Sequence, residues 1–215
     1  LLLSHLPGAP VQRVTPTLAR AMGMLLARLH TQPLDHYGEV VEPEETPPSG
    51  WWAMLHQHFE NWKPHCARVL DPDLYAEAVD CYETRYATLP EPDGPRWTHF
   101  DFRPGNVLAS GDRITGLIDF ESARGGSADL DFVWMQNRVW STAPETQVPF
   151  LAAYAAVRPL PPIEATLPFY RLHHALGGVA WCVRRTDTKD PFFRENLALL
   201  KATLTPQVTP PANPL

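Results

Sequence analysis

The sequence has few lysines and no excess of positive charge. Only three of its 215 residues are lysine, and the formal net charge is −6. A protein that binds nucleic acid usually carries a basic stripe, so this balance argues against a nucleic-acid partner. The mild acidity is compatible with a cationic ligand, but it is too common among proteins to indicate one.

Cysteine and long apolar runs are also scarce. Cys66, Cys81 and Cys182 lie far apart and form no CxxC pair, which argues against a zinc ribbon or a disulfide framework. We therefore expect a reduced, cytoplasmic setting. No run approaches the roughly 18 apolar residues of a membrane span, and the first ten residues lack the features of a signal peptide, so no membrane partner is expected.

A glycine-rich phosphate-binding loop is missing as well. No G-x-G-x-x-G pattern occurs before residue 98, and no lysine lies where a strand could use it to anchor ATP phosphates. Proline is the one abundant residue, and its doubled occurrences fall in connections and in the tail, residues 206–215.

Apolar periodicity predicts a mainly helical protein. Leu18, Met22, Leu25 and Leu29 form one apolar stripe behind Thr15, a good N-cap residue. Two short β-rich segments, NVLAS and RITGLIDF, are joined by the turn SGD and predict one small hairpin buried in the helical body. Further helices are expected over residues 49–65, 71–89, 129–139, 145–157, 163–185 and 191–204.

Polar groups gather in the stretch THFDFRPGNVLASGDRITGLIDFESARGG, residues 98–126. Asn106 follows Asp101 across a Pro-Gly turn, and Asp119 ends the second strand, so the hairpin is expected to bring Asn106 and Asp119 side by side. One carboxylate and one amide oxygen suit Mg²⁺. Asp101 is then left to orient an attacking hydroxyl and accept its proton, which completes the parts needed for phosphoryl transfer.

Two motifs in this stretch carry a resemblance to known proteins. HFDFRPGN overlays the protein-kinase catalytic-loop pattern H-R-D-L-x-x-x-N, and IDFE contains the aspartate of the second, metal-binding motif. Together with ADLDFV, LARLH and LLLSHLPG, they resemble the aminoglycoside phosphotransferase and choline kinase-like family. The resemblance covers essentially the whole chain, as the C-terminal lobe of that family's kinase-like fold.

The resemblance implies an architecture for the chain. The fold class is mainly α with a small β-hairpin, within an α+β kinase-like fold whose β-rich N-terminal lobe is absent from this chain. The implied parts are an inter-lobe hinge, a helical catalytic lobe and a Pro-rich tail, at residues 1–8, 9–205 and 206–215. The catalytic loop would span residues 97–106, and the metal-binding hairpin residues 106–121.

The resemblance also implies roles for five residues. Asp101 would be the catalytic base, and Asn106 and Asp119 would hold Mg²⁺ and so bind the cofactor. His99 would be the scaffold of the catalytic loop, and Asp131 would brace that loop through its backbone amides.

Further positions follow with less definite roles. Arg103 would pair with the transferring phosphoryl group. Glu121 fits two roles equally, a metal ligand or a cap on a neighbouring loop. Leu3 and Ser4, in the hinge, would contact the nucleotide. Phe100 stands between His99 and Asp101, where this family often has a small residue, and its larger ring would narrow the substrate side of the site.

The implied activity is transfer of the γ-phosphoryl group of ATP, or GTP, to a hydroxyl group of a small molecule. The acceptor would be like an aminoglycoside, choline or an amino alcohol, and five acidic residues between 35 and 45 slightly favour a cationic one. Nothing indicates an oligomeric state. The chain does not begin with methionine, so we expect either processing or a longer gene product that supplies the ATP-covering lobe.

Other interpretations remain open. A catalytically incompetent lobe, or a binding module without the ATP clamp, would keep the same fold. The polar stretch could also serve only to stabilise the hairpin, or belong to a metal-dependent hydrolase that adds His173 or His174. A set of aromatic side chains at helical spacing is expected in the core, with an amine-binding cage as the alternative: Trp51, Trp52, His56, Phe59 and Trp62.

Overall fold

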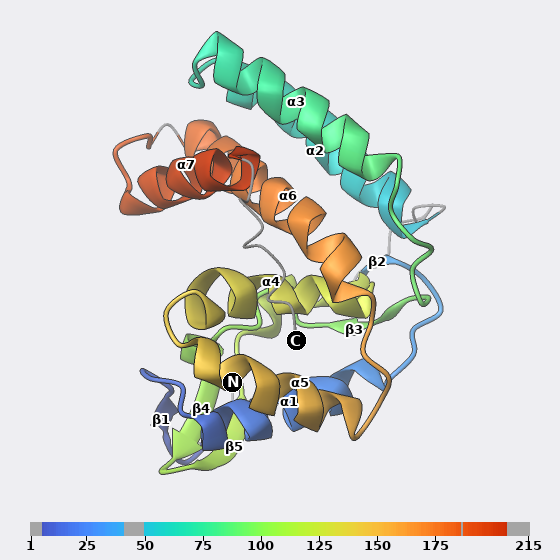
Figure 1. Ribbon diagram of the computed structural model, residues 1–215, viewed down its shortest axis with the longest axis vertical. Coiled ribbons are helices and arrows are strands. Elements are labelled where there is room, and N and C mark those ends of the chain that lie inside the picture. Colours follow the sequence, from blue (N-terminus) through green and yellow to red (C-terminus); the bar gives the residue numbers. More distant parts are fainter. Residues whose placement is uncertain (1–5, 41–49, 186, 206–215) are drawn as a thin grey trace, which may run out of the picture. The chain divides into compact units, whose positions relative to one another are not determined.

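The computed structural model describes residues 6–40, 50–185 and 187–205, which divide into two compact units (Figure 1). The first unit comprises Leu1–Met54 and Pro90–Leu167, and the second Leu55–Leu89 and Pro168–Leu215. Helices predominate and the strands are short, which confirms the predicted mainly helical class. No helix in the described residues is long and apolar enough to cross a membrane.

Helix α1, Pro16–His30, begins as predicted. The Thr15 hydroxyl accepts a hydrogen bond from the Leu18 amide at 3.2 Å, and Pro16 occupies the first turn, where no amide donor is needed. The buried face, however, differs from the predicted stripe, because Leu25 and Leu29 are only half-buried. A 3.6-residue period continues the face from Leu18 through these residues instead: Ala19, Met22, Gly23, Leu26, Ala27 and His30.

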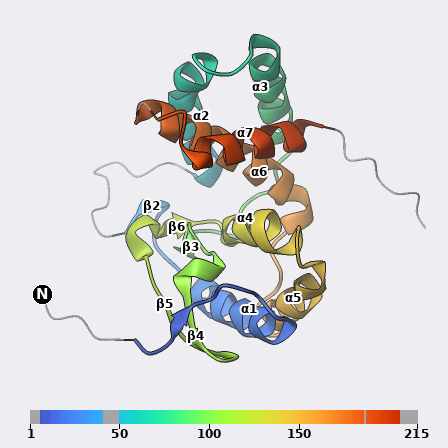
Figure 2. The same cartoon turned by 90° about the vertical axis from the view of Figure 1, so that its left-hand side faces the viewer.

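Helix α1 packs against α5, Gln147–Ala155, and the two lie side by side in Figure 2. Gly23 faces the backbone carbonyl of Phe150 so closely that a Cβ atom would have no room there. The two helix backbones therefore approach more closely than side chains would allow.

The predicted hairpin is present, but it belongs to a larger sheet. Strands β4, Val107–Ser110, and β5, Arg113–Leu117, pair antiparallel, with a bulge between Leu108 and Ala109. Strand β1, Ala9–Pro10, adds an edge to β4, a position that tolerates proline. The prediction that the hairpin is buried is wrong for β5, whose residues are half-buried or exposed.

A second three-stranded sheet was not predicted. It has the order β2-β6-β3, with β2 at Gly38–Glu39, β3 at Arg96–Thr98 and β6 at Arg124–Gly126. The prediction of a single hairpin is therefore wrong, because strands of two or three residues carry no alternating pattern that could reveal them. Strand β3 contains the first two residues of the predicted catalytic loop, residues 97–106.

The helix expected over residues 129–139 is irregular. A 3₁₀ turn, Ala128–Asp131, passes into the short helix α4, Phe132–Trp134, and then into a π-helical segment, Met135–Trp140. Such segments are uncommon in proteins and often lie at functional sites. Asp131 lies at the junction of the turn and α4.

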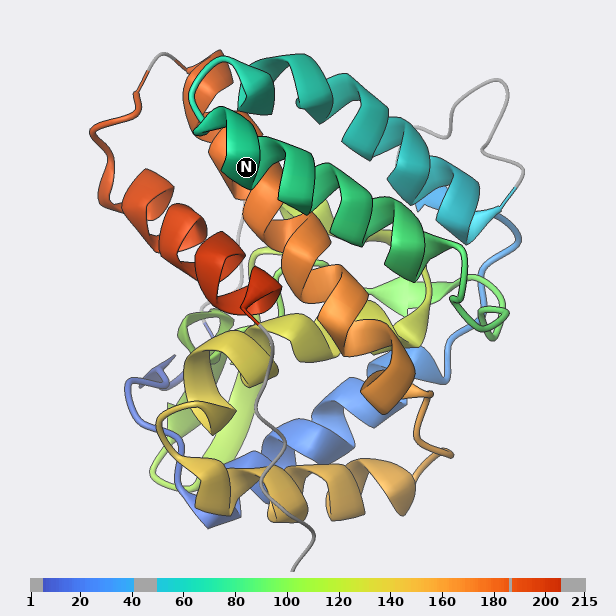
Figure 3. The same ribbon diagram turned by 45° about the horizontal axis from the view of Figure 1, so that its top comes forward.

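The second unit is a group of packed helices (Figure 3). Helices α2, Trp51–Ala67, and α6, Ile163–Arg184, each begin in the first unit and end in the second, whereas α3, Pro72–Tyr86, and α7, Pro191–Leu204, lie wholly in the second. The core of the unit is aromatic. The rings of Phe59 and Tyr82 are stacked, with centroids 3.6 Å apart.

Candidate active site

The predicted catalytic loop, residues 97–106, begins within β3 and ends in a 3₁₀ turn, Pro104–Asn106, which leads into β4. The Asn106 amide donates to the Arg103 carbonyl at 2.9 Å, which closes this turn. The Asn106 carbonyl in turn accepts a hydrogen bond from the Ile118 amide at 2.9 Å. The loop is therefore joined at its end to the segment that carries Asp119.

Asp101 lies within this loop with one carboxylate oxygen held by two side chains. Its Oδ2 accepts hydrogen bonds from Asn106 Nδ2 and from Arg103 Nε, each at 2.9 Å. The other oxygen, Oδ1, accepts no hydrogen bond from the described residues. Charge-assisted bonds of this kind orient a carboxylate firmly. Asp101 is thus fixed through Oδ2 and can receive a proton at Oδ1.

Asn106 is buried, and its amide nitrogen is fully used. Nδ2 donates both to the Asp101 backbone carbonyl and to Asp101 Oδ2, at 2.9 Å in each case. This arrangement assigns the amide so that its oxygen, Oδ1, is the atom left to bind a cation. Asp119 is exposed and immediately follows Ile118, whose amide is bonded to Asn106. An amide oxygen and a carboxylate at adjoining positions fit the ligand preference of Mg²⁺.

The backbone is strained at both ends of this arrangement. Phe100 and Asp119 have φ values of 67° and 69°, and they are the only non-glycine residues with positive φ in the described part of the chain. Such conformations cost on the order of 1–3 kcal/mol each and persist only where the surroundings enforce them. Their position beside Asp101 and within the proposed metal-binding segment favours a functional reason for the strain.

Asp131 supplies the constraint at Phe100. Its Oδ1 accepts from the Phe100 amide and its Oδ2 from the His99 amide, both at 2.7 Å, and the Asp131 side chain is fully buried. A hydrogen bond to a charged group contributes about 1.5–3 kcal/mol. Two such bonds are enough to offset the strain at Phe100, so Asp131 can hold the loop in its unusual conformation.

His99 links the loop to the same hairpin. Its Nε2 lies 2.9 Å from the Ile118 carbonyl, and since a carbonyl only accepts, Nε2 carries the proton. The ring packs beside Phe120, with centroids 4.7 Å apart, while the buried Nδ1 has no hydrogen-bond partner among the described residues. His99 therefore holds the segment before Asp101 against the segment before Asp119.

The half-buried Phe100 side chain packs against two residues of the first unit. The Arg124 guanidinium lies over its ring at 4.0 Å, and the Trp51 ring meets it edge-on at 6.3 Å. Burial lowers the pKa of Arg124 from its usual value, and the nearby Glu39 carboxylate, 3.5 Å away, opposes that shift. The aromatic residue between His99 and Asp101 is thus part of a packed cluster.

A family model described as "Phosphotransferase enzyme family" matches residues 1–171 of the chain. The chain belongs to this phosphotransferase family. The predicted family resemblance is therefore confirmed.

Curated relatives of this family member include homoserine kinases. That of Gluconobacter oxydans is 30% identical over 173 residues, which cover 77% of this chain and 52% of the relative. That of Parvibaculum lavamentivorans is 28% identical over 172 residues, or 76% of this chain and 50% of the relative. The chain thus spans about half the length of the curated relatives it matches.

Solved structures of phosphotransferases share the fold. An aminoglycoside phosphotransferase in complex with AMP-PNP and hygromycin B has a TM-score of 0.66 at 16% identity, covering 93% of this chain and 69% of that one. A macrolide 2'-phosphotransferase from Brachybacterium faecium has a TM-score of 0.60 at 19% identity, covering 96% and 70%. At these identities the likeness establishes the fold alone.

Two of the remaining predicted site residues lie in the part of the chain that the structure describes. Arg103 is partly exposed and bonded to Asp101, from which its guanidinium could turn toward a phosphoryl group. Glu121 is exposed in the 3₁₀ turn Phe120–Ser122, which leaves both of its predicted roles open. Leu3 and Ser4 of the predicted hinge lie outside the described residues, as does the tail, residues 206–215.

Of the two histidines in the hydrolase alternative, His173 packs in the core of the second unit and His174 is half-buried. His173 is buried in the second unit, with Nδ1 3.3 Å from the Tyr82 hydroxyl and its ring 4.6 Å from that of Trp62. Trp51 and Phe59, from the predicted aromatic set, are also buried, as the core interpretation expects. In the described residues, three side chains each place one potential metal-ligand atom within 4.8 Å of the other two: His56, Glu60 and Glu83. None of them is a predicted metal-binding or catalytic residue.

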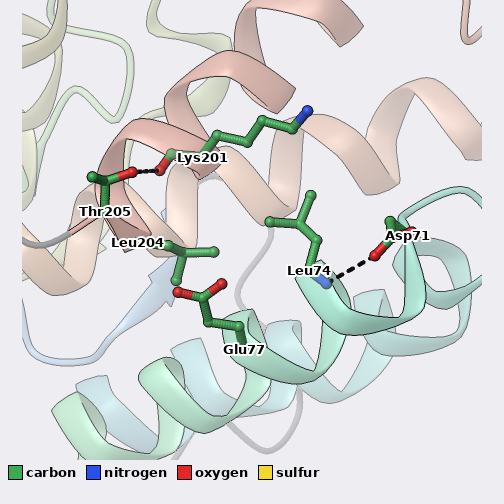
Figure 4. A pocket seen from close by; sticks show the side chains of 6 residues that line it. All are labelled: Asp71, Leu74, Glu77, Lys201, Leu204 and Thr205. Carbon is green, nitrogen blue, oxygen red and sulfur yellow. Dashed lines mark hydrogen bonds between the residues drawn. The ribbon is translucent and has the colours of Figure 1, made fainter.

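A pocket of about 480 Å³ lies between α3 and α7 in the second unit (Figure 4). Figure 4 shows the Asp71 side chain bonded to the Leu74 amide, and the Thr205 hydroxyl bonded to the Lys201 carbonyl. These two bonds cap helix ends, so Asp71 and Thr205 are engaged in local structure. None of the predicted site residues lines it.

Sequence reasoning gave no role to two residues linked to Asp131, although His30 ends the quoted motif LARLH. His30 approaches Asp131, and Tyr154 approaches His30. A signal for His30 was present, because it lies twelve residues after Leu18 on the buried face of α1. A polar side chain on such a face needs a partner, and the partner is Asp131.

Proposed function

We propose that this chain is the C-terminal catalytic lobe of an ATP-dependent kinase that phosphorylates a hydroxyl group on a small molecule. The observation that carries the proposal is the Asp101 carboxylate, held by Asn106 and Arg103 through one oxygen and open at the other. A degenerate binding module has no chemical need for that arrangement. The family and the kinase names of the curated relatives support the same reaction class.

The reaction exchanges one phosphorus–oxygen bond for another. The acceptor oxygen forms a bond to the γ-phosphorus while the bond from that phosphorus to the β–γ bridging oxygen breaks, and ADP leaves. The acceptor proton passes to Oδ1 of Asp101, which accepts no hydrogen bond from the described residues. Fixing Oδ2 keeps Oδ1 aimed in one direction, so the acceptor is oriented before it reacts.

Asn106 Oδ1 and the Asp119 carboxylate are the proposed ligands for Mg²⁺. When bound there with ATP, the ion would neutralise phosphate charge. The chain itself contributes the fixed spacing of these ligands, through the bond from the Ile118 amide to the Asn106 carbonyl. The Arg103 guanidinium, now paired with Asp101, would also interact with the phosphoryl group and stabilise its negative charge during transfer.

The proposed acceptor is a small amino alcohol or hydroxy amino acid, and L-homoserine is the first to test. The homoserine kinases among the curated relatives favour it over larger acceptors. Because the chain spans about half the length of these relatives, the test uses the full-length protein.

The test is an acceptor screen with Mg·ATP. ADP release and the mass of the product would be measured with L-homoserine, ethanolamine, choline and an aminoglycoside, each against a blank without acceptor. Acceptor-dependent ADP release with a phosphorylated product is expected for at least one compound. ATP binding without phosphorylation of any acceptor would favour the binding-module alternative.

A further inference from the structure

A row of polar side chains lies behind Asp131 in the first unit, and the proposed reaction uses none of them. His30, the last residue of α1, is fully buried, and its Nε2 lies 3.0 Å from Asp131 Oδ2. Its Nδ1 lies 2.9 Å from the hydroxyl oxygen of Tyr154, which is also fully buried, on α5. The neighbouring helices α1 and α5 (Figure 2) therefore meet Asp131 through one hydrogen-bonded pair.

The Asp131 carboxylate can only accept, so His30 Nε2 carries a proton and donates to it. In the neutral ring, Nδ1 then accepts from the Tyr154 hydroxyl. The Tyr154 oxygen also accepts a hydrogen bond from Arg158 Nη1 at 3.2 Å. Burial raises the pKa of Tyr154 well above its usual value, so its hydroxyl remains a donor.

Asp131 receives three donors on two oxygens. The His99 amide and His30 Nε2 share Oδ2, while the Phe100 amide occupies Oδ1. The two amides belong to the loop itself, whereas His30 belongs to α1. Among these three hydrogen bonds, only the one from His30 comes from outside the loop, and without it the side chain of Asp131 has no such restraint on its rotation.

We propose that His30, supported by Tyr154, is a positioning residue for phosphoryl transfer, acting through Asp131 on the loop that carries Asp101. The inference rests on the proposed function of Asp101. His30 holds the rotation of the Asp131 carboxylate. That carboxylate then keeps Phe100 at its positive φ, and Phe100 directly precedes Asp101 in the chain.

The outer end of the row reaches the surface of the first unit. Arg158 is paired with Asp93, and Asp93 also pairs with Arg96 of β3 at 3.2 Å. Two sets of contacts therefore reach the loop after β3. One passes through Asp93 to Arg96 on β3, and the other passes through the His30–Tyr154 pair to Asp131, which bonds the strained residue Phe100.

Three substitutions at position 30 separate the hydrogen bond from the packing. His30→Gln places an amide nitrogen near the position of Nε2 and can still donate to Asp131. His30→Asn places its polar atoms near Nδ1 and can reach only Tyr154, while His30→Leu fills the space without any polar atom. The measurements are kcat, KM and the midpoint of thermal unfolding, on the complete protein with its acceptor.

The expected order of kcat is His, then Gln, then Asn and Leu together. The Leu variant should lose about tenfold or more in kcat, with KM for the acceptor changed by less than about threefold, because the lost interaction orients the base. Tyr154→Phe, which keeps the ring, should lose less. A purely structural role predicts that kcat follows thermal stability, with Leu above Asn, and that order would overturn the proposal.

Hydrogen exchange tests whether His30 stabilises the loop without requiring any catalytic activity. Hydrogen exchange in a peptide covering residues 97–103 reports the His99 and Phe100 amides, which donate to Asp131. His30→Leu should exchange faster there, and His30→Gln should exchange at nearly the unsubstituted rate. Equal exchange in both variants would overturn the positioning role, whereas an unsubstituted protein that phosphorylates no acceptor would overturn only the proposed function.

The second unit provides a matched control. Tyr82 and His173 form another buried tyrosine–histidine hydrogen bond, with 3.3 Å between the hydroxyl and Nδ1. Tyr82→Phe should lower thermal stability about as much as Tyr154→Phe does, but leave kcat and exchange in the 97–103 peptide unchanged. Loss of kcat in both variants would show that general destabilisation, not positioning, lowers activity.

Discussion

Each of the two units buries one tyrosine–histidine pair, and the two pairs differ in what lies beyond the histidine. In the first unit, His30 is hydrogen-bonded to the Asp131 carboxylate, which in turn accepts from the backbone of the proposed catalytic loop. In the second, His173 packs against aromatic rings such as that of Phe169, and the Tyr82 hydroxyl donates a hydrogen bond to the Leu55 carbonyl at 3.3 Å. A tyrosine–histidine pair thus contacts the residue that holds a strained loop in one unit, and packs within an aromatic core in the other.

The comparison shows that a buried polar pair does not indicate function by itself. What distinguishes the first pair is its connection to an ionised group that in turn holds a strained backbone. The second pair satisfies its own hydrogen bonds and stabilises helix packing. Substitutions in the first unit should therefore change turnover, and those in the second should change stability.

The largest effect is expected at Asp101. Asp101→Asn keeps the size of the side chain but removes the proton acceptor, so kcat should fall by about 10²- to 10⁴-fold. Affinity for Mg·ATP should stay nearly constant, because Asp101 is not a proposed metal ligand. Steady-state kinetics and a nucleotide titration check both parts, and a variant that keeps most of its turnover would rule out Asp101 as the base.

A smaller effect of a different kind is expected at Asp119. Asp119→Ala removes a proposed carboxylate ligand of Mg²⁺ and should weaken Mg·ATP binding by about tenfold or more. Titration calorimetry with and without Mg²⁺ measures this, and Glu121→Ala is a control from the same exposed segment. Unchanged Mg·ATP affinity in Asp119→Ala would remove it from the metal site. An equal loss in both variants would assign Glu121 the metal-ligand role as well.

The smallest effect is expected from pH, and it belongs to the second unit. Burial, together with His58 and His174, lowers the pKa of His173 well below 6.5, so this histidine stays neutral in the folded protein while the unfolded chain takes up a proton. Stability should therefore be retained above about pH 6.5 and fall as the pH drops below it, by at most about 1.4 kcal/mol per pH unit.

The pH effect can be isolated with one variant. Urea unfolding of the unsubstituted protein and of His173→Gln, at pH 7.5, 6.5 and 5.5, gives the free energy of unfolding for each. The variant should show a shallower loss between pH 6.5 and 5.5. Parallel curves would mean that His173 contributes nothing to the acid sensitivity of the second unit.

Much of the fold was predictable because its signals are local. The caps at Thr15 and Asp71, each followed by proline, mark helix starts within a few residues, and the hairpin turn is equally local. The contact between Asp101 and Asn106 was also predictable, because only a Pro-Gly turn separates them. These features depend on neighbours in the sequence, which a single chain displays directly.

The remainder depends on pairing over long separations. Strands β2, β3 and β6 are two or three residues long, and they exist only because they meet one another. The partners His30 and Tyr154 are 124 residues apart, and no spacing rule connects them. Nor does the sequence show that Phe100 adopts a positive φ, since an aromatic residue there is set by tertiary contacts and not by its own preference.

The contact between Gly23 and the Phe150 carbonyl has a consequence for how this protein can change over time. Any larger residue at position 23 would push α5 outward, and Tyr154 lies four residues beyond Phe150 on that helix. Position 23 should thus be among the least tolerant in a library of random substitutions selected for activity. A site far from Asp101 in the chain would then limit which sequences can still position it.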